Sequence, residues 1–307
     1  MNPMIDAVLL IAFGGPTAPH EIAPFLENVT RGRRIPRGRI EEVARHYARM
    51  PGGRSPLNEL TQAQARALAE LLARAGTPFP VHVGMRQWHP YLDETLADLA
   101  ARGARRCLGI IMSPLRSEAS WERYQADVAE ARARTAGAPE VVFAPPWSAH
   151  HGFIDAVADR ARHALDEVPE GDRRWTPLVF TAHSIPTPMA DAAPYVEDFT
   201  AASRAVAHRL EHARWSLAYQ SRSGRPEDAW LVPDVNDVLA SFAVDGERHA
   251  VVVPLGFVCD HVEILYDLDV EAAGRARERG LTLHRARAVN DHPTFIAALA
   301  DMVNNPW

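Results

Sequence analysis

The sequence predicts an α/β protein built from two similar Rossmann-like halves, each a four-stranded parallel sheet flanked by helices. Short apolar runs of β-type residues alternate along the chain with amphipathic segments of helical period, which is the pattern of parallel sheets covered by helices. The runs form two sets of four. The first and fifth runs both lead into a turn with proline, and the third and seventh both have proline in their exits. We therefore expect one half in residues 1–146 and the other in residues 147–307.

Each apolar run has the length and composition of a buried strand. The clearest, Ala250–Leu255, is uninterrupted and rich in valine, as expected for a parallel strand buried on both faces. The strands are predicted at Ala7–Phe13, Pro80–Met85, Cys107–Ser113, Glu140–Ala144, Pro177–Ala182, Trp215–Gln220, Ala250–Leu255 and Leu281–His284. Helices are predicted at Leu60–Arg74, Trp121–Thr135, Gly152–Leu165, Ala190–His212, Val235–Phe242 and Val262–Arg279.

The composition excludes several classes of function. The chain has 307 residues and a net charge of −6, which argues against a general nucleic-acid-binding protein. All 33 basic residues are arginine, so neither a Schiff-base lysine nor a Walker lysine is present. The 2 cysteines, Cys107 and Cys259, are too few for a disulfide framework and are consistent with a reducing cytoplasm.

The opening of the chain predicts a buried strand rather than a targeting segment. It is apolar only from Ala7 to Phe13 and has neither a basic lead nor a cleavage pattern. No stretch approaches the roughly 18 apolar residues that a membrane span requires. We therefore expect a cytoplasmic protein without a membrane span. The sequence also has no GxGxxG, P-loop, HExxH, GxSxG or paired CxxC motif, which leaves the corresponding enzyme classes without support.

Three carboxylates follow a predicted strand at helical spacing. Glu263, Asp267 and Glu271 are four residues apart and form one row on a helix. Such a row repels itself unless a cation is bound, and it begins at the carboxyl end of a strand, where open α/β sheets bind ligands. Two structural explanations remain open. Asp260 and Glu263 fit a capping box, and Glu271 can pair with Arg275.

A histidine ends another predicted strand of the same half. His183 closes the run LVFTAH and is followed by SIPTP, whose prolines oppose direct continuation into a helix. A single histidine is more often structural than catalytic. However, His183 and Glu263 follow the first and third strands of one parallel sheet, so their side chains can face each other. An imidazole opposite a carboxylate suits proton abstraction or the binding of a borderline divalent metal.

The first half contributes residues suited to binding an anion and a flat apolar group. The stretch NVTRGRRIPRGRI places Arg31 and Arg33 with three further arginines on a predicted loop, where guanidinium groups can hold carboxylates or phosphates. A merely soluble loop is the alternative. Ser55 is expected to be the N-cap of a helix, with Pro56 at the first helical position. Tyr124 is an aromatic residue that can line a flat cleft, although core packing explains it equally well.

In their order and spacing, several motifs resemble the ferrochelatase family. In the second half these are FTAHSIP, YQSR followed by WLVPDV, PLGFVCDHVEILYDLD, and VNDHPTFIAAL. In the first half they are LLIAFGGP, PFLENVTRGRRIP and GGRSPLN. The resemblance covers nearly the whole chain, and the motifs that contain His183 and Glu263 are its most specific part.

The resemblance implies two Rossmann-like halves that hold a tetrapyrrole in the cleft between them, and insertion of Fe2+ with release of two pyrrole protons. It places His183 and Glu263 at the metal-insertion face as catalytic and metal-binding residues. Asp267 and Glu271 continue the acidic row that in some members holds a hydrated divalent cation. Whether His183 or Glu263 accepts the proton or holds the iron stays open.

The stretch NVTRGRRIP resembles the branch that acts on coproporphyrin III, which has four propionates. Arg31 and Arg33 are the expected propionate contacts, and Phe13, Ser55 and Tyr124 are the other expected substrate-binding residues. Some members of this branch have an iron-ligating tyrosine at the position of Phe13, a role that phenylalanine cannot fill. Others carry a [2Fe-2S] cluster, which 2 cysteines cannot build. Protoporphyrin IX remains the alternative substrate.

The expected partners are the porphyrin and Fe2+, with no cofactor beyond that substrate iron, no nucleic acid, and a monomeric protein. Two other classes of protein are alternatives. A non-catalytic tetrapyrrole carrier would not need His183 and Glu263 together. A periplasmic-type binding protein would share the two-lobed α/β shape, but the sequence shows no signal peptide.

Overall fold

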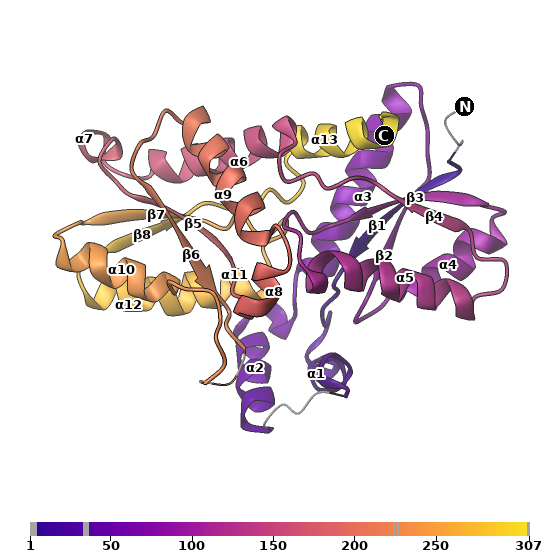
Figure 1. Ribbon diagram of the computed structural model, residues 1–307, viewed down its shortest axis with the longest axis horizontal. Coiled ribbons are helices and arrows are strands. Elements are labelled where there is room, and N and C mark those ends of the chain that lie inside the picture. Colours follow the sequence, from indigo (N-terminus) through magenta and orange to yellow (C-terminus); the bar gives the residue numbers. More distant parts are fainter. Residues whose placement is uncertain (1–4, 33–36, 224, 226, 306–307) are drawn as a thin grey trace. The chain divides into compact units, whose positions relative to one another are not determined.

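The computed structural model describes residues 5–32, 37–223, 225 and 227–305 (Figure 1). The chain divides into two compact units. The first comprises Met1–Met112, Ala119–Pro145 and Ile296–Trp307, and the second comprises Ser113–Glu118 and Pro146–Phe295. Each unit contains one four-stranded sheet in which all neighbouring strands are parallel. The predicted α/β class with two parallel four-stranded sheets is therefore confirmed.

The first unit is organised around β1, whose six residues are all buried. The strand order is β2-β1-β3-β4, and the register pairs Leu10 of β1 with Val83 and Ile110 on either side. Apolar side chains on one face of β1, including Leu9, pack with Leu96 of α4 and Val128 of α5. The strands are β1 (Ala7–Ala12), β2 (Val81–Met85), β3 (Arg106–Ile111) and β4 (Glu140–Phe143).

Helices cover both faces of this sheet, with α3 on one side and α4 and α5 on the other (Figure 1). The helices are α1 (Ile22–Thr30), α2 (Arg37–Arg49), α3 (Leu57–Arg74), α4 (Leu92–Ala101) and α5 (Arg123–Arg134). Short 3-10 turns occupy Pro19–Glu21 and Pro51–Gly53, and a π-helix at Glu118–Glu122 precedes α5.

The second unit repeats this plan around β5. The strand order is β6-β5-β7-β8, so β6 and β8 are the two edge strands. The strands are β5 (Leu178–His183), β6 (Trp215–Gln220), β7 (His249–Val253) and β8 (Thr282–Arg285). All eight observed strands lie within two residues of the predicted ranges, because each is marked by its own apolar run.

Helices also cover both faces of the second sheet. One face packs against α10, α11, α12 and the π-helix between the last two, through residues such as Leu239, Ile264 and Leu268. The opposite face carries α6 and α9 (Figure 1). The helices are α6 (His151–Asp166), α7 (Glu170–Arg173), α8 (Thr187–Asp191), α9 (Tyr195–Arg209), α10 (Val235–Val244), α11 (Val262–Leu265), the π-helix at Asp267–Ala272 and α12 (Ala273–Glu278). Most of the last helix, α13 (Pro293–Asn304), belongs to the first unit.

Two predicted helices are interrupted in the structure. The range Ala190–His212 contains the end of α8 and then α9, which begins after Pro194, because proline lacks the N–H that a continuous helix needs. The range Val262–Arg279 is continuous in direction but contains the π-helix Asp267–Ala272. A spacing of four residues fits both an α-helix and a π-turn, so the sequence could not distinguish them.

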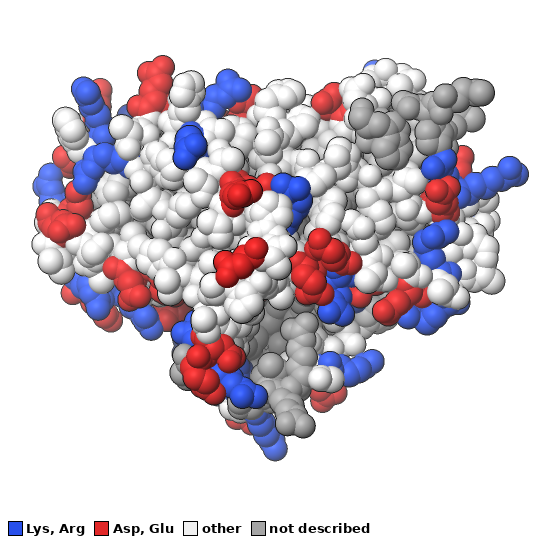
Figure 2. Space-filling model, in the orientation of Figure 1, with Lys and Arg blue, Asp and Glu red and all other residues white. Residues whose placement is uncertain are grey.

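Acidic and basic side chains alternate over the face of the molecule shown in Figure 2. This distribution is in keeping with a chain that has 33 basic and 39 acidic residues. None of the helices in the described part of the chain has the length and apolar character needed to cross a membrane.

Candidate functional site

His183 and Glu263 lie together at the carboxyl edge of the second sheet. His183 is the last residue of β5, and Glu263 is in the first turn of α11, which follows β7. Because β5 and β7 are adjacent parallel strands, their carboxyl ends open on the same edge. The Nε2 atom of His183 is 3.8 Å from Oε1 of Glu263. Both side chains are about one third exposed, at 31% and 36%, so this pair is reachable from solvent.

Neighbouring groups fix the orientation of the His183 ring. Its Nδ1 atom lies against the backbone carbonyl oxygen of Ser184. Since a carbonyl can only accept, Nδ1 must carry the proton, and in the neutral ring Nε2 keeps a free lone pair. The Tyr195 hydroxyl donates to the carbonyl of His183 over 2.8 Å. Burial raises the pKa of Tyr195, so this hydroxyl remains a donor. The bare nitrogen of His183 therefore points toward Glu263.

Glu263 is held in its ionised form. Burial acts to raise its pKa, but the positive charge that His183 carries when protonated, a hydrogen bond from His261 and the charge of protonated His261 outweigh burial and lower the pKa to about 2. Nε2 of His261 lies 3.5 Å from Oε2 of Glu263. The Gln220 amide, at the end of β6, donates to the Glu263 backbone carbonyl over 2.7 Å. The carboxylate is thus a fixed negative charge between two imidazoles.

Asp267 lies in the π-helix and accepts a hydrogen bond from the residue that follows β6. The Ser221 hydroxyl donates to Oδ2 of Asp267. Ser221 adopts a positive φ of 61°, which is uncommon for a residue other than glycine and turns the chain directly after β6. Burial, together with the charges of Glu263 and Glu271, raises the pKa of Asp267 to about 7 despite the hydrogen bond from Ser221. The first two carboxyl groups of the predicted row therefore differ strongly in acidity.

Glu271, the third member of that row, has a cationic partner of its own. Its Oε1 atom is 2.6 Å from the Arg275 guanidinium, the i,i+4 pairing considered from the sequence. The π-helix between Asp267 and Ala272 forms where the backbone N–H groups of Val270 and Glu271 both reach the carbonyl of Tyr266. π-turns of this kind occur mainly within α-helices and often at functional sites.

Four residues at this edge were not predicted as site residues from the sequence: Tyr195, Gln220, Ser221 and His261. Gln220 and Ser221 lie in the motif YQSR and His261 in the motif PLGFVCDHVEILYDLD, but neither motif gave them a role. The exits of all strands in a parallel sheet share one edge, so the position of QSR at the exit of β6 could have indicated Gln220 and Ser221. No pattern in the sequence indicates the role of Tyr195, because its hydroxyl bonds a backbone carbonyl, that of His183.

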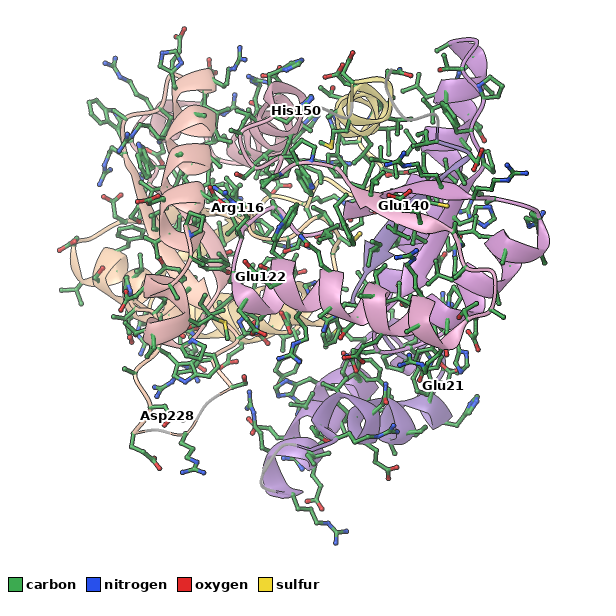
Figure 3. All side chains as sticks on the ribbon, turned by 45° about the vertical axis from the view of Figure 1, so that its right-hand side comes forward. Glu21, Arg116, Glu122, Glu140, His150 and Asp228 are labelled. Carbon is green, nitrogen blue, oxygen red and sulfur yellow. The ribbon has the colours of Figure 1, made fainter. Side chains whose placement is uncertain are left out.

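Phe13 follows β1 at the carboxyl edge of the first sheet and is 37% exposed, which is unusual for a large apolar side chain in this protein. Its ring packs edge-on against Phe25 at a centroid distance of 6.5 Å, and the Arg86 guanidinium lies 5.9 Å from its centroid. Glu21, labelled in Figure 3, accepts hydrogen bonds from Thr17 and from the Trp88 indole and so fixes the loop that follows. Phe13 is thus an exposed ring on a rigid turn.

Tyr124 and Ser55 are largely buried. Tyr124 packs in the core beside α4 and β1, and the Arg86 guanidinium stacks 4.2 Å above its ring while pairing with Asp127. The Ser55 hydroxyl accepts a hydrogen bond from the backbone N–H of Leu57, the first residue of α3. The N-cap position itself is occupied by Pro56, so Ser55 lies one residue before the cap that the sequence predicted it to form. Ser55 also lies so close to Gly15 that a Cβ there would be 2.8 Å from the serine side chain. Their roles in substrate binding stay predictions.

Arg31 directly follows α1 and is exposed, so its guanidinium can reach a ligand from solvent. The other predicted propionate contact, Arg33, lies outside the described residues.

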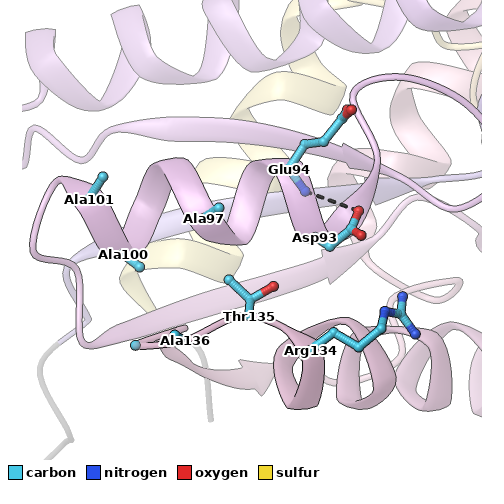
Figure 4. A pocket seen from close by; sticks show the side chains of 9 residues that line it. Asp93, Glu94, Ala97, Ala100, Ala101, Arg134, Thr135 and Ala136 are labelled. Carbon is cyan, nitrogen blue, oxygen red and sulfur yellow. Dashed lines mark hydrogen bonds between the residues drawn. The ribbon is translucent and has the colours of Figure 1, made fainter.

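A surface pocket of about 690 Å3 lies between α4 and the end of α5 (Figure 4). Its lining combines small residues, four of them alanine, with the charged residues Asp93, Glu94 and Arg134. None of the site residues predicted from the sequence contributes to it. The pocket is open to solvent and brings together no imidazole or thiol, so it offers little for catalysis.

Within the described residues, no three histidine, cysteine, aspartate or glutamate side chains are placed to hold a metal ion. The pair formed by His183 and Glu263 can offer one nitrogen and one carboxylate, which leaves a metal with open positions. Two protein ligands suit a metal ion that is passed on to a ligand set outside the protein better than a metal ion that is bound permanently.

The two-unit α/β fold is shared with solved structures of other proteins. It is similar to the structure titled SirB from Bacillus subtilis with Fe3+, with a TM-score of 0.60 and 11% identity over 99% of this chain and 96% of that one. It is also similar to the sirohydrochlorin chelatase SirB of Bacillus subtilis subspecies spizizenii in complex with cobalt, with a TM-score of 0.56, 13% identity, and 99% and 95% coverage. At these identities the likeness concerns the fold alone.

Sequence similarity defines the family more narrowly. The Ferrochelatase family model matches residues 5–306. A coproporphyrin III ferrochelatase of Frankia alni is 44% identical over 97% of this chain and 79% of its own length. Another, from Mycolicibacterium smegmatis, is 41% identical over 97% of this chain and 89% of its own. The chain belongs to the ferrochelatase family.

Proposed function

We propose that this protein inserts Fe2+ into coproporphyrin III and releases two protons, as a step of heme biosynthesis. Family membership and relatives at about 40% identity that are named coproporphyrin III ferrochelatase support the reaction. The observation that carries the chemistry is the pairing of His183 Nε2 with Glu263 at 3.8 Å on the carboxyl edge of the second sheet.

The His183 ring is arranged to accept a proton. Its Nδ1 proton is engaged by the Ser184 carbonyl, so only Nε2 can receive a proton from a pyrrole nitrogen. Imidazole exchanges protons near neutral pH, which suits a general base. Once protonated, the ring carries a positive charge 3.8 Å from the Glu263 carboxylate, and that charge pair stabilises the product of proton transfer.

Glu263 acts in this proposal as a permanent anion rather than as the first base. Its lowered pKa keeps it ionised at neutral pH, so it can attract Fe2+ and later the imidazolium of His183. The four pyrrole nitrogens of the substrate supply the ligands that the protein does not. Metal insertion also requires a bent macrocycle with its lone pairs out of plane, and a rigid site can favour that form over the flat one.

Coproporphyrin III has four propionates, which favours a site with several arginines. Arg31 is exposed at the end of α1 and free to reach a carboxylate, and guanidinium groups bind carboxylates with two parallel hydrogen bonds. We infer that Arg31 contacts a propionate and that Arg33 assists. Phe13 offers an exposed ring for the macrocycle, but it has no oxygen to ligate product iron.

We propose no resident cofactor, since 2 cysteines cannot hold a [2Fe-2S] cluster. A hydrated divalent cation at Asp267 and Glu271 stays a prediction, and binding there requires Glu271 to leave its partner Arg275. A cytoplasmic location, a monomeric state and the absence of a nucleic-acid partner also stay predictions. Size-exclusion chromatography with light scattering tests the monomer.

An anaerobic metallation assay tests the proposed function. Purified protein is mixed with Fe2+ or Zn2+ and free coproporphyrin III or protoporphyrin IX, and the shift of the porphyrin absorbance bands is followed. Many turnovers with a higher kcat/KM for coproporphyrin III are expected. A single stoichiometric shift would instead indicate a carrier, and a preference for protoporphyrin IX would overturn the substrate assignment.

A further inference from the structure

Arg285, the last residue of β8, ties together two parts of the segment that carries Glu263 and Asp267. Its Nη1 atom donates to Asp260 over 2.7 Å. Its Nε and Nη2 atoms donate to the two oxygens of Asp269 over 2.6 and 2.8 Å. The Arg285 side chain is only 13% exposed and Asp260 9%, so this pair is shielded from water, whereas Asp269 is 35% exposed.

The two carboxylates bracket the proposed reaction site in the sequence. Asp260 precedes Glu263 by one turn, and Asp269 follows Asp267 by two residues within the π-helix. Asp260 is itself fixed, because it accepts from the backbone N–H of Ala288 and the amide of Asn290 as well as from Arg285. Arg285 therefore links a rigid anchor before α11 to a point inside the π-helix.

The π-helix is the part of this segment that needs such support. A π-turn contains one residue more than an α-helical turn and is rarely stable without outside contacts. If the turn relaxed to α-helical geometry, residues beyond it would rotate by about 100° around the helix axis. Asp269 lies inside the π-helix, so a change of register there would also displace its carboxylate relative to Arg285, and the bidentate contact therefore favours the π register.

The segment is held from both edges of the sheet. From the edge strand β6, Gln220 bonds the Glu263 carbonyl and Ser221 bonds Asp267. From the opposite edge strand β8, Arg285 bonds Asp260 and Asp269. Without the second attachment, Asp267 and Glu263 would be fixed from one side only.

We propose that Arg285 is a positioning residue for metal insertion, which holds the π register of residues 267–272 and thereby the placement of Glu263 and Asp267. This inference rests on the proposed function. The carboxylates that Arg285 bonds are Asp260 and Asp269 rather than Glu263 and Asp267, so it acts through the helix. Lysine cannot replace it, because a single ammonium group lacks the planar fork that reaches both carboxylates.

The test compares Arg285→Lys with Arg287→Lys. Arg287 also faces Asp260, at 3.5 Å, but it is 63% exposed and makes no ion pair with Asp269, whose described partner is Arg285. For Arg285→Lys we expect kcat for metal insertion to fall at least about tenfold with KM for the porphyrin nearly unchanged, since small misplacements of reacting groups reduce rates strongly. Arg287→Lys should keep the wild-type kcat.

Hydrogen–deuterium exchange provides a measurement that is independent of activity. In Arg285→Lys, amides of residues 262–272 should exchange faster while those of β7 keep their protection. Asp269→Asn weakens the bidentate contact with Arg285 but leaves the bond between Arg285 and Asp260, and it should show the same local increase in exchange. This variant replaces Arg285→Lys in the test if Arg285→Lys does not fold. Wild-type kcat or unchanged exchange in a folded variant would overturn the positioning role. Absence of turnover in the wild type would reject the proposed function, while the exchange measurement would still decide whether Arg285 holds the π register.

Discussion

His183 Nε2 and Glu263 Oε1 lie 3.8 Å apart, although they follow different strands of the second sheet. The His183 ring is turned so that its bare nitrogen faces the carboxylate, because Nδ1 is engaged by the Ser184 carbonyl. The negative charge of Glu263 favours the protonated ring once a proton arrives. This relationship makes His183 the group on which proton removal from the porphyrin depends.

We therefore expect His183→Ala to lower kcat for metal insertion by about 100-fold or more, the range that general-base catalysis usually contributes. Porphyrin binding, followed by fluorescence quenching, should remain, since the substitution removes no apolar contact in the first unit. His163→Ala is the matched control, because His163 is 71% exposed on α6 and bonds a backbone carbonyl of its own helix. Wild-type turnover in His183→Ala would contradict the role.

A second prediction concerns Arg31 and the number of propionates. Arg31→Ala should raise KM for coproporphyrin III about tenfold, as expected for the loss of one hydrogen bond between charged groups. KM for protoporphyrin IX, which has two propionates, should change less. Arg102→Ala is the control, because Arg102 is 65% exposed at the end of α4, outside this arginine cluster, and pairs with Asp98. Equal losses for the two porphyrins would argue against a propionate contact by Arg31.

The sequence was sufficient for the fold because each strand is a separate apolar run and at least one helix separates consecutive strands. The nearness of His183 and Glu263 also followed from sequence reasoning, since the carboxyl ends of adjacent parallel strands meet at one edge. Neither inference required knowledge of side-chain packing.

The remainder of the site depends on contacts that leave no pattern. The Gln220 amide bonds the backbone carbonyl of Glu263, and any residue at position 263 has such a carbonyl. Ser221, which bonds Asp267, adopts a positive φ that nothing in the sequence indicates. The π-helix is hidden for a related reason. Carboxylates four residues apart share a face in either helix type, so the row gave no sign of the altered register.

A third prediction concerns the pH dependence of stability at the opposite, amino-terminal edge of the second sheet. His249 Nδ1 lies 3.1 Å from His284 Nε2, with Asp172 and Arg248 as the other charged neighbours. Burial, followed by the charges of His284 and Arg248, lowers the pKa of His249 in spite of Asp172. A lowered folded-state pKa means that the unfolded chain binds this proton more readily. The contribution of neutral His249 to the free energy of unfolding is therefore fully present above its unfolded-state pKa of about 6.5. It is lost as the pH falls toward its folded-state pKa.

Urea unfolding midpoints at several pH values between about 7.5 and 5 check this prediction. The wild type should lose stability as the pH falls, and His249→Gln should lose less, since glutamine does not titrate. His163→Gln on exposed α6 serves as the control and should follow the wild type. If His249→Gln and the wild type lose stability in parallel, the imidazole pair does not contribute.

The last prediction concerns Gly256, which lies directly behind the strand that ends in His183. Its backbone N–H donates to the carbonyl of Thr181 over 3.0 Å. A Cβ at this position would lie 2.7 Å from the Cβ and 2.8 Å from the Cα of Ala182, closer than carbon atoms can pack. Gly256→Ala should therefore destabilise the protein by about 1–3 kcal/mol, the usual result of overpacking a core, and also lower kcat because His183 is the next residue.

Gly274→Ala provides the matched comparison. Gly274 lies inside α12, and a Cβ there would meet no atom within 4 Å. The same substitution should stabilise the protein by about 0.5–1 kcal/mol, because alanine loses less backbone freedom than glycine when a helix forms. The free energies of unfolding of the two variants should thus change in opposite directions. If Gly256→Ala unfolded at the wild-type urea midpoint, the turn behind β5 would have room to move, and the rigid placement of His183 inferred from its contacts would be wrong.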